Sequence, residues 1–421
     1  MNQTLNQTLP LYFCEGYAVS RYQEKVILMN TTSGLNFKMT EDCFNVLSEM
    51  IRQNVTVETG LSWFQDPDDQ DFFRRALEVM IKYGILVQEP EQEVYTVTLE
   101  LTNRCNLRCR HCCMNALPAC EDTDLPTEDW KRIIDKLSGL HLEALTLTGG
   151  EPLIRQDFFE IAQYAKDTLK VPMQLMSNAT LITEAVADRL IELFDDFSFS
   201  LDGADEESCA PVRGKGVFAN AMRGIMRMKE RGMKHFSLSF TEVRQNQHAV
   251  QKFEDLCKEL GATPMIRNFD LVGRAATHLD LVPEDVDADY MPVTVPFPKG
   301  CDCFPPHDMP VGVSCGAILE KFAIGYDGTL FPCISMIQPE FGMGNVLDID
   351  DFASFYRSGG YQSSAGYQLF RNSHPAFSPE CADCPARLFC DNCVTYIYRQ
   401  KNHPKRDFFC ALKQKELLRV W

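Results

Sequence analysis

The stretch YTVTLELTNRCNLRCRHCCMNA, Tyr95 to Ala116, joins a β-prone run to a loop with four cysteines in nine positions. The alternating apolar residues of YTVTLEL predict a strand, and the cysteines follow where it ends. Thiols this crowded are reactive at a surface. Burying them would take Arg104, Arg108 and Arg110 into apolar surroundings, which is energetically costly for charged side chains without partners. We therefore expect the cluster to have a chemical role.

Composition narrows the class of protein. The chain has 421 residues, 45% of them hydrophobic, which predicts a globular protein of two or three domains. Residues 1–10, MNQTLNQTLP, do not resemble an export signal, and no run of about 18 apolar residues occurs, so we expect a cytoplasmic protein with no membrane partner. A net charge of −18 argues against nucleic acid as a partner. In such a chain, 18 cysteines favour metal ligation over disulfides.

Strand and helix patterns alternate six times between Tyr95 and about Phe269. The predicted strands are YTVTLEL, EALTLTG, MQLMSN, FSFSLDG, HFSLSF and PMIRNF. Repeated βα units predict an α/β fold with a parallel sheet, and six units are two fewer than a closed eight-stranded barrel needs. We expect a partial (β/α)6 barrel, with a flat doubly wound sheet as the alternative.

Polar motifs follow the first four predicted strands. The cysteine loop follows the first strand, TGGEP (148–152) the second and SNAT (177–180) the third, and SLDG (200–203) closes the fourth. Because the carboxyl ends of parallel strands lie at one rim, all four motifs are predicted to meet there. Unrelated loops would be distributed over both rims, so this convergence predicts an active site.

Cys105, Cys109 and Cys112 offer three thiolates on one loop. Zinc sites usually combine a C-x2-C pair with a distant second pair, whereas four-iron clusters accept less regular runs. Three ligands leave one iron open to a further ligand. The adjacent Cys113 is not expected to reach the same cluster.

This spacing resembles the CxxxCxxC motif of the radical S-adenosylmethionine (SAM) enzymes. The resemblance implies a [4Fe-4S] cluster that binds SAM and cleaves it to a 5′-deoxyadenosyl radical. It places His111 near the adenine, the TGGEP loop at the amino group, Asn178 near the ribose or methionyl part, and Ser200 and Arg213 at the carboxylate. The expected residues at the amino group are Gly149, Gly150 and Glu151.

The C-terminal cysteines resemble the SPASM pattern of radical SAM maturases, which implies two auxiliary [4Fe-4S] clusters and three clusters in all. The first would use Cys315, Cys333 and Cys393 with Cys301 or Cys303, and the second Cys381, Cys384, Cys390 and Cys410. The family usually has three residues before the cysteine that matches Cys393, and this chain has two. A pair of zinc knuckles is the alternative.

The first ninety residues predict three strands and then three helices, a winged-helix-like order. This order resembles the element of peptide-modifying enzymes that binds a leader peptide as an added strand. A DNA-binding winged helix is the alternative, but DCFNVLSEMIRQN, residues 42–54, has one arginine against two acids.

Together these resemblances predict a maturase of a ribosomally synthesised peptide, with a recognition domain at 1–92, a partial barrel at 93–298 and a SPASM domain at 299–421. We expect a thioether or carbon–carbon crosslink, and an electron donor such as flavodoxin or ferredoxin. Sulfatase-type maturases have an acidic base after the cysteine that matches Cys333, where this chain has Ile334. The alternatives are a peptide epimerase, with Cys209 or Cys120 on rim loops as hydrogen donor, and a non-catalytic zinc-binding scaffold.

Overall fold

The computed structural model describes residues 4–88, 95–119, 124–269, 271–283, 312–390, 393–401 and 406–417. The chain divides into two compact units. One unit holds Met1–Glu93, Pro292–Glu320 and Gln368–Trp421, and the other holds Val94–Met291 and Lys321–Tyr367. Of the predicted site residues, Cys301 and Cys303 lie outside the described residues, as does Cys120.

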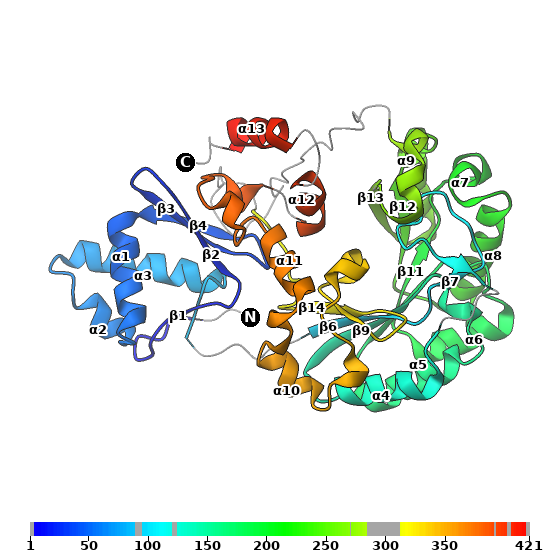
Figure 1. Ribbon diagram of the computed structural model, residues 1–421, viewed down its shortest axis with the longest axis horizontal. Helices are drawn as coiled ribbons and strands as arrows, with labels where there is room; N and C mark the ends of the chain where they lie inside the picture. The colour runs from blue at the N-terminus through cyan, green and yellow to red at the C-terminus, as the bar shows by residue number, and fades with distance from the viewer. Residues whose placement is uncertain are drawn as a thin grey trace. The chain divides into compact units, whose positions relative to one another are not determined.

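The larger unit is built on an open, mainly parallel sheet (Figure 1). Its strands, in the order in which they pair, are β13 (Thr263–Asn268), β12 (Phe236–Glu242), β11 (Asp196–Ser200), β10 (Met173–Ser177), β9 (Leu142–Thr148), β6 (Tyr95–Glu100), β14 (Lys321–Ile324) and β15 (Leu330–Phe331). The six predicted strands are all present and parallel, so the α/β prediction with a parallel core is confirmed. Within the described residues, β13 and β15 do not pair with each other, so the sheet does not close.

Two further strands extend this sheet beyond the prediction. β14 lies parallel to β6, and β15 pairs with β14 as an antiparallel hairpin. Both strands belong to the part of the sequence predicted as the C-terminal domain. The predicted boundary at 298/299 therefore does not coincide with the edge of the sheet, because Phe322, Ala323 and Ile324 are buried in the same core as β6.

Amphipathic helices connect the parallel strands and lie along the outside of the sheet (Figure 1). They are α4 (Thr127–Leu137), α5 (Phe158–Leu169), α6 (Glu184–Leu193), α7 (Glu206–Arg213), α8 (Val217–Glu230) and α9 (Val250–Leu260). In α4, Trp130, Ile133, Ile134 and Leu137 are buried at the spacing of one helix face. Two short strands, β7 (Arg104–Cys105) and β8 (Leu117–Pro118), bracket the cysteine loop, and α10 (Phe352–Arg357) follows the hairpin.

The N-terminal part of the other unit has the predicted three strands and three helices. β2 (Tyr17–Tyr22), β3 (Lys25–Asn30) and β4 (Asn36–Thr40) form an antiparallel sheet in that order, followed by α1 (Glu41–Arg52), α2 (Val57–Leu61) and α3 (Pro67–Lys82). The short strands β1 (Tyr12–Phe13) and β5 (Leu86–Val87) pair beside them. Thr40 caps α1, and Pro67 occupies the first turn of α3, where its missing N–H is not needed.

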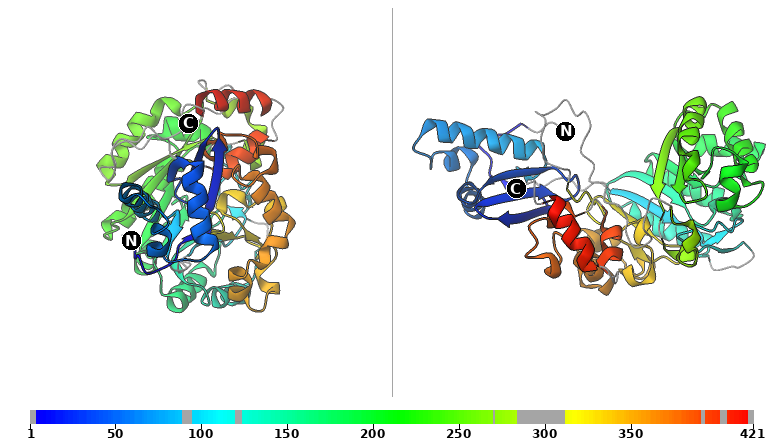
Figure 2. Two further views of the ribbon diagram at one scale, coloured as in Figure 1. Left: turned by 90° about the vertical axis from the view of Figure 1, so that its left-hand side faces the viewer. Right: turned by 90° about the horizontal axis from the view of Figure 1, so that it is seen from above.

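The middle strand of this sheet is buried on both faces. Val26 and Leu28 face the helices and join their core. Ile27 and Met29 face the opposite side, where they pack with Leu388 and Phe389 from the C-terminal part of the same unit. The right-hand view of Figure 2 shows the blue sheet between a blue helix and the orange C-terminal segment. This sheet is therefore the middle layer of its unit.

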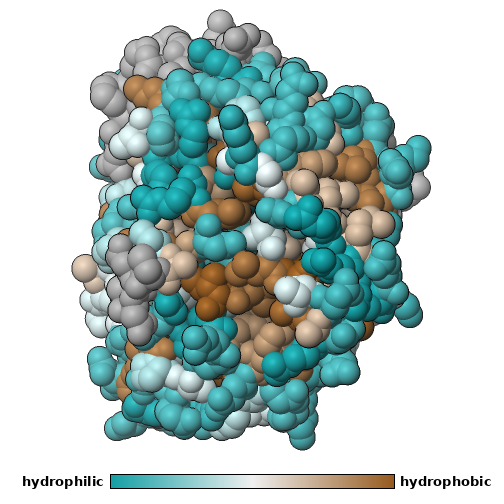
Figure 3. All heavy atoms as spheres, turned by 90° about the vertical axis from the view of Figure 1, so that its right-hand side faces the viewer, coloured by the Kyte–Doolittle hydropathy of each residue, from teal (hydrophilic) through white to brown (hydrophobic). Residues whose placement is uncertain are grey.

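The remaining helices complete the C-terminal part. α11 (Ala365–Ser373) contains the boundary between the two units, and α12 (Val394–Lys401) and α13 (Arg406–Leu417) follow. Among the described residues, no helix combines the length and apolar character needed to cross a membrane. On the face of the molecule in Figure 3, hydrophilic side chains surround a central hydrophobic area.

Candidate functional site

The motifs predicted at one rim do meet there. The amide of Gly150 donates to Thr102 O at 2.7 Å, and the amide of Glu151 donates to Arg104 O at 2.8 Å, so the TGGEP loop lies directly against the start of the cysteine loop. The amide of Asn178 donates to Glu151 Oε2 at 2.8 Å, which adds the loop after β10. Strand ends far apart in sequence thus build one site.

Of the three predicted cluster cysteines, Cys105 is the last residue of β7, and Cys109 and Cys112 lie on the segment between β7 and β8. Cys109 is buried, Cys105 and Cys112 are half-buried, and Cys113 is exposed. Burial raises the pKa of the Cys105 thiol to about 12, and it also raises that of Cys109, with the charge of Arg213 opposing it. Buried thiols become thiolates when a metal binds them, so this donor set fits an iron–sulfur cluster. Among the residues that the structure describes, no three metal-ligating side chains converge on a single ion.

The glycines of TGGEP permit the close approach of the two loops. A Cβ on Gly149 would lie 2.6 Å from Thr102 O, and one on Gly150 would lie 2.3 Å from Arg104 O. An ammonium group only donates hydrogen bonds, so the backbone carbonyl oxygens of this loop are the groups that can accept them. This arrangement fits the amino group of SAM.

Glu151 is fully buried and held from three sides. Its carboxylate accepts hydrogen bonds from Ser177 Oγ at 2.9 Å and from the amides of Asn178 and Leu153. Burial raises the pKa of Glu151 to about 7, with these hydrogen bonds opposing the rise. Asn178 also donates through Nδ2 to Asn106 Oδ1 at 2.9 Å, which ties the third strand end to the cysteine loop.

A buried carboxylate that the sequence did not single out joins two predicted residues. Asp202, in SLDG, lies 2.6 Å from Arg213 Nε and 2.9 Å from His111 Nε2. Burial alone would raise the pKa of Asp202, but the charges of Arg213 and His111 hold it well below its usual range. Ser200 lies at the end of β11, in register with Ser239 of β12.

A second residue that the sequence did not single out, Arg274, holds the cysteine loop. Its guanidinium donates to the carbonyl oxygens of Cys109 and Ala116, and its amide donates to Cys112 O at 2.9 Å. Gly273 has φ +58, and a Cβ there would lie 2.2 Å from Cys113 O. The only sequence signal was a Gly-Arg pair shortly after the sixth strand, which is weak.

The prediction that Cys209 lies on a rim loop is wrong. Cys209 lies within α7, is fully buried, and has a thiol pKa of about 12, raised mainly by burial.

Three of the four cysteines predicted for the second auxiliary cluster, Cys381, Cys384 and Cys410, lie near one another. Burial, and after it the nearby Cys381 and Cys384, raise the pKa of the Cys410 thiol. From the same helix, α13, Gln414 Nε2 donates to Cys384 Sγ at 3.3 Å, and Lys413 Nζ donates to Cys390 O at 2.6 Å. The ligand roles of these three cysteines and of Cys390 stay predictions.

The cysteines predicted for the first auxiliary cluster are divided between the units. Cys315 and Cys393 belong to the unit with the three-stranded sheet, where the amide of Cys315 donates to Thr31 O at 2.7 Å. Cys333 belongs to the unit with the parallel sheet, immediately before a short 3-10 helix that begins at Ile334. Their ligand roles remain predictions.

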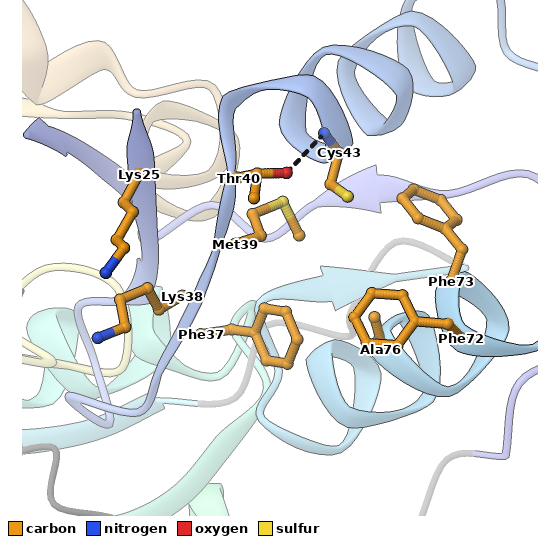
Figure 4. A pocket seen from close by; sticks show the side chains of 9 residues that line it. All are labelled: Lys25, Phe37, Lys38, Met39, Thr40, Cys43, Phe72, Phe73 and Ala76. Carbon is orange, nitrogen blue, oxygen red and sulfur yellow. Dashed lines mark hydrogen bonds between the residues drawn. The ribbon is translucent and has the colours of Figure 1, made fainter. Parts of the chain in front are cut away.

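The N-terminal part contains an apolar groove of about 270 Å³ beside the edge strand β4. It is lined by Lys25, Phe37, Lys38, Met39, Thr40, Cys43, Phe72, Phe73 and Ala76. Figure 4 shows Phe37 of β4 and Phe72 of α3 directed toward the same space, with Lys25 and Lys38 at one end. Phe72 is 59% exposed, which is unusual for an aromatic side chain of this size.

Comparison with known proteins adds independent information. Residues 99–255 match the radical SAM superfamily, and residues 315–385 match the SPASM iron-sulfur cluster-binding domain. The mycofactocin maturase MftC of Mycolicibacterium smegmatis is 30% identical over 303 residues, which cover 68% of this chain and 74% of that protein.

Solved structures agree on the fold. Streptococcus suis SuiB bound to S-adenosylmethionine aligns with a TM-score of 0.54 at 18% identity, covering 93% of this chain and 97% of SuiB. The same protein bound to precursor peptide SuiA aligns with a TM-score of 0.52 at 16% identity, covering 95% and 99%.

The chain belongs to the radical SAM enzymes with a SPASM domain, and within them to the maturases. Its cofactors are accordingly SAM with a [4Fe-4S] cluster in the barrel, and further iron–sulfur clusters in the SPASM domain, three clusters in all. The predicted family and cofactors are confirmed, and the zinc-binding scaffold is set aside.

Proposed function

We propose that this maturase crosslinks a ribosomally synthesised precursor peptide whose leader binds the N-terminal groove. The groove beside β4 is the observation that carries the proposal, because β4 lies at the edge of the described three-stranded sheet, where a peptide can add as a strand, and the adjoining groove offers apolar contacts. SuiB, which has the same fold, is described with a precursor peptide bound. A flavodoxin or ferredoxin is the proposed electron donor.

In this proposal Cys105, Cys109 and Cys112 hold the radical SAM cluster. SAM is held by His111, Gly149, Gly150, Glu151, Asn178, Ser200 and Arg213. The auxiliary clusters take the ligand sets given above, Cys315, Cys333 and Cys393 with Cys301 or Cys303, and Cys381, Cys384, Cys390 and Cys410. When bound, these groups would supply a radical that takes a hydrogen atom from a peptide carbon. They would also supply an acceptor for the one electron released when that carbon radical bonds a cysteine sulfur and the thiol proton leaves.

Crosslinking is favoured over epimerisation for two reasons. A crosslink removes two hydrogens from the peptide and needs an electron acceptor, which the auxiliary clusters provide. An epimerase must return a hydrogen atom to the peptide, and Cys209, one of the two predicted donors, is fully buried within α7. The thiol of a donor must reach the substrate radical.

Two experiments test the proposal. A cysteine-bearing precursor peptide encoded beside this gene is treated with enzyme, SAM and reductant in heavy water and then weighed. Loss of two hydrogens supports a crosslink, whereas an unchanged hydrogen count with one carbon-bound deuterium identifies an epimerase.

The second experiment replaces Cys105, Cys109 and Cys112 by alanine. The anaerobically reconstituted wild-type chain should contain about twelve iron atoms, and the triple variant about eight. The variant should make no 5′-deoxyadenosine while retaining the auxiliary iron. Formation of 5′-deoxyadenosine by this variant would show that the cluster assignment is wrong.

A further inference from the structure

Asp202 occupies an unusual position for a carboxylate beside the site. Its side chain is fully buried, and it lies in a left-handed backbone conformation with φ +54 at the end of the SLDG motif. Its own amide donates to Ser239 O at 3.1 Å, and its carbonyl accepts from Asn246 Nδ2 at 3.1 Å. The backbone of Asp202 is thus fixed on both sides, so the carboxylate has a defined position.

The two carboxylate oxygens of Asp202 have different partners. Oδ1 accepts from the amide of Thr241, at 2.5 Å, and this contact fixes the rotation of the carboxylate. Oδ2 faces the site, where Arg213 Nε and His111 Nε2 both donate to it. Removing Asp202 would leave the largely buried Arg213 without its counter-charge, and both Arg213 and His111 without this hydrogen-bond acceptor. Arg213 and His111 therefore depend on Asp202 for their orientation.

The contact geometry leaves part of Arg213 directed elsewhere. Asp202 engages only Nε, while Nη1 lies 3.8 Å from Cys109 Sγ, next to the predicted cluster. A guanidinium has five N–H donors in a fixed fork, so anchoring Nε sets the direction of the terminal nitrogens. Those nitrogens suit a second carboxylate, and the proposed function assigns Arg213 to the carboxylate of SAM.

We propose that Asp202 is the positioning residue that aims the Arg213 guanidinium at the carboxylate of SAM. Asp202 itself does not touch SAM in this proposal, and its effect is transmitted through Arg213. The inference rests on the proposed role of Arg213, so its test must separate the two.

The test compares SAM with decarboxylated SAM, which has the same adenosine and sulfonium but lacks the carboxylate. Dissociation constants are measured by anaerobic equilibrium dialysis with the reconstituted protein. The dissociation constant of decarboxylated SAM divided by that of SAM is the ratio that reports how strongly the site recognises the carboxylate. A residue with only a structural role would weaken both ligands alike and leave the ratio unchanged.

Asp202→Asn should lower this ratio by roughly 10- to 100-fold, the range for a lost charged hydrogen bond. Arg213→Lys should lower it by a similar factor, because a lysine ammonium lacks the fork needed to bond both carboxylates. Asp205→Asn is the matched control. Asp205 caps α7, the helix that carries Arg213, and its carboxylate contacts Ser208 and Lys252. Asparagine can replace it as a cap, so the ratio should not change.

The outcomes separate the two proposals. If Arg213→Lys lowers the ratio and Asp202→Asn does not, the positioning role of Asp202 is refuted while the role of Arg213 stands. If Arg213→Lys leaves the ratio unchanged, both are refuted. Asp202→Ser removes the carboxylate with less steric demand and replaces the asparagine variant if that variant loses its iron or fails to fold.

Discussion

Deleting the N-terminal module should remove iron from the SPASM domain as well as leader binding. The sheet face that carries Ile27 and Met29 covers the buried side chains of Leu388 and Phe389. In the sequence, these two residues lie between Cys384 and Cys390, two proposed ligands of the second auxiliary cluster. Removing residues 1–90 would expose both side chains to water.

The expected loss follows from the buried contacts. Fully burying a large apolar side chain contributes about 1.5–3 kcal/mol, so exposing Leu388 and Phe389 costs about 3–6 kcal/mol. Five hydrogen bonds are lost as well. They run from Arg387 to Val19 O, from Ser20 to Pro385 O, from the amide of Cys315 to Thr31 O, from the amide of Gly312 to Gly34 O, and from Ser314 Oγ to Thr32 O. Each contributes about 0.5–1.5 kcal/mol, and the sum is comparable to the ~5–15 kcal/mol stability of a whole domain.

The assay is iron and sulfide per chain after anaerobic reconstitution. We expect the deletion variant to fall from about twelve iron atoms toward about four, while reductant-driven SAM cleavage persists, because the three cysteines of the barrel belong to the other unit. A truncated protein that keeps all its iron and unfolds like the full chain would refute the shared core.

A matched pair of point variants gives the same information with less disruption. Met29 and Leu28 are adjacent and both fully buried, so replacing either by alanine carries a similar intrinsic cost of about 2–5 kcal/mol. Met29 faces residues 386–389 of the C-terminal part, and Leu28 faces the helices. Only Met29→Ala should reduce the auxiliary iron content.

Three further predictions concern single side chains. Phe72→Ala should weaken binding of the precursor peptide, measured by fluorescence anisotropy, about 5- to 30-fold without lowering Tm, because about 1–2 kcal/mol of apolar contact is lost. The control is Trp63→Ala, which removes a 39% exposed aromatic side chain outside the groove and should leave peptide binding unchanged. Arg274→Lys should make the radical SAM cluster bleach faster in air, measured by absorbance, because a lysine cannot bridge two loop carbonyls; equal rates would contradict this. Burial, and after it the charge of Asp327, raise the pKa of Glu100 from 4.5 to about 8. Between these pH values the folded chain keeps the Glu100 proton and the unfolded chain releases it, so the free energy of unfolding falls by about 1.4 kcal/mol per pH unit as pH rises. Urea unfolding of Glu100→Gln should show a flatter pH profile and greater stability than wild type at pH 8, and parallel profiles would contradict the assignment.

The parallel core and the meeting of the motifs were predictable because they depend on local patterns. Each strand reads as a short apolar run, and a parallel arrangement forces the loops that follow onto one rim, whatever their separation in the chain. Spacing alone predicts Cys105, Cys109 and Cys112 as cluster ligands, because a loop with three thiols has few other uses, and this assignment stays a prediction.

Asp202 and Arg274 could not be predicted in the same way. Each acts on groups that are distant in sequence, Asp202 on His111 and Arg274 on the carbonyl oxygens of the cysteine loop. A single buried Asp or Arg has no periodic sequence pattern, and its structural role depends on partners that only the fold brings close. The resemblance assigns residues to SAM, but it points to no residue that would orient Arg213.

The double-sided burial of the N-terminal sheet did have a signal in the sequence. KVILMN has four apolar residues in succession, and all four are buried, whereas a strand with one solvated face alternates. The same run that predicts a strand therefore also indicates that its second face is covered. The cover comes from residues 386–389, which no local pattern could identify.

This two-sided sheet limits how leader recognition can be tested. A substitution in β3 that weakens peptide binding has two explanations, because Val26 and Leu28 support the core under the groove while Ile27 and Met29 support the SPASM segment. Loss of auxiliary iron would block turnover even if the leader still bound. Variants that address recognition alone belong at the exposed rim of the groove, and each variant needs its iron content measured beside its affinity, because only a change in affinity at full iron content reports on the leader.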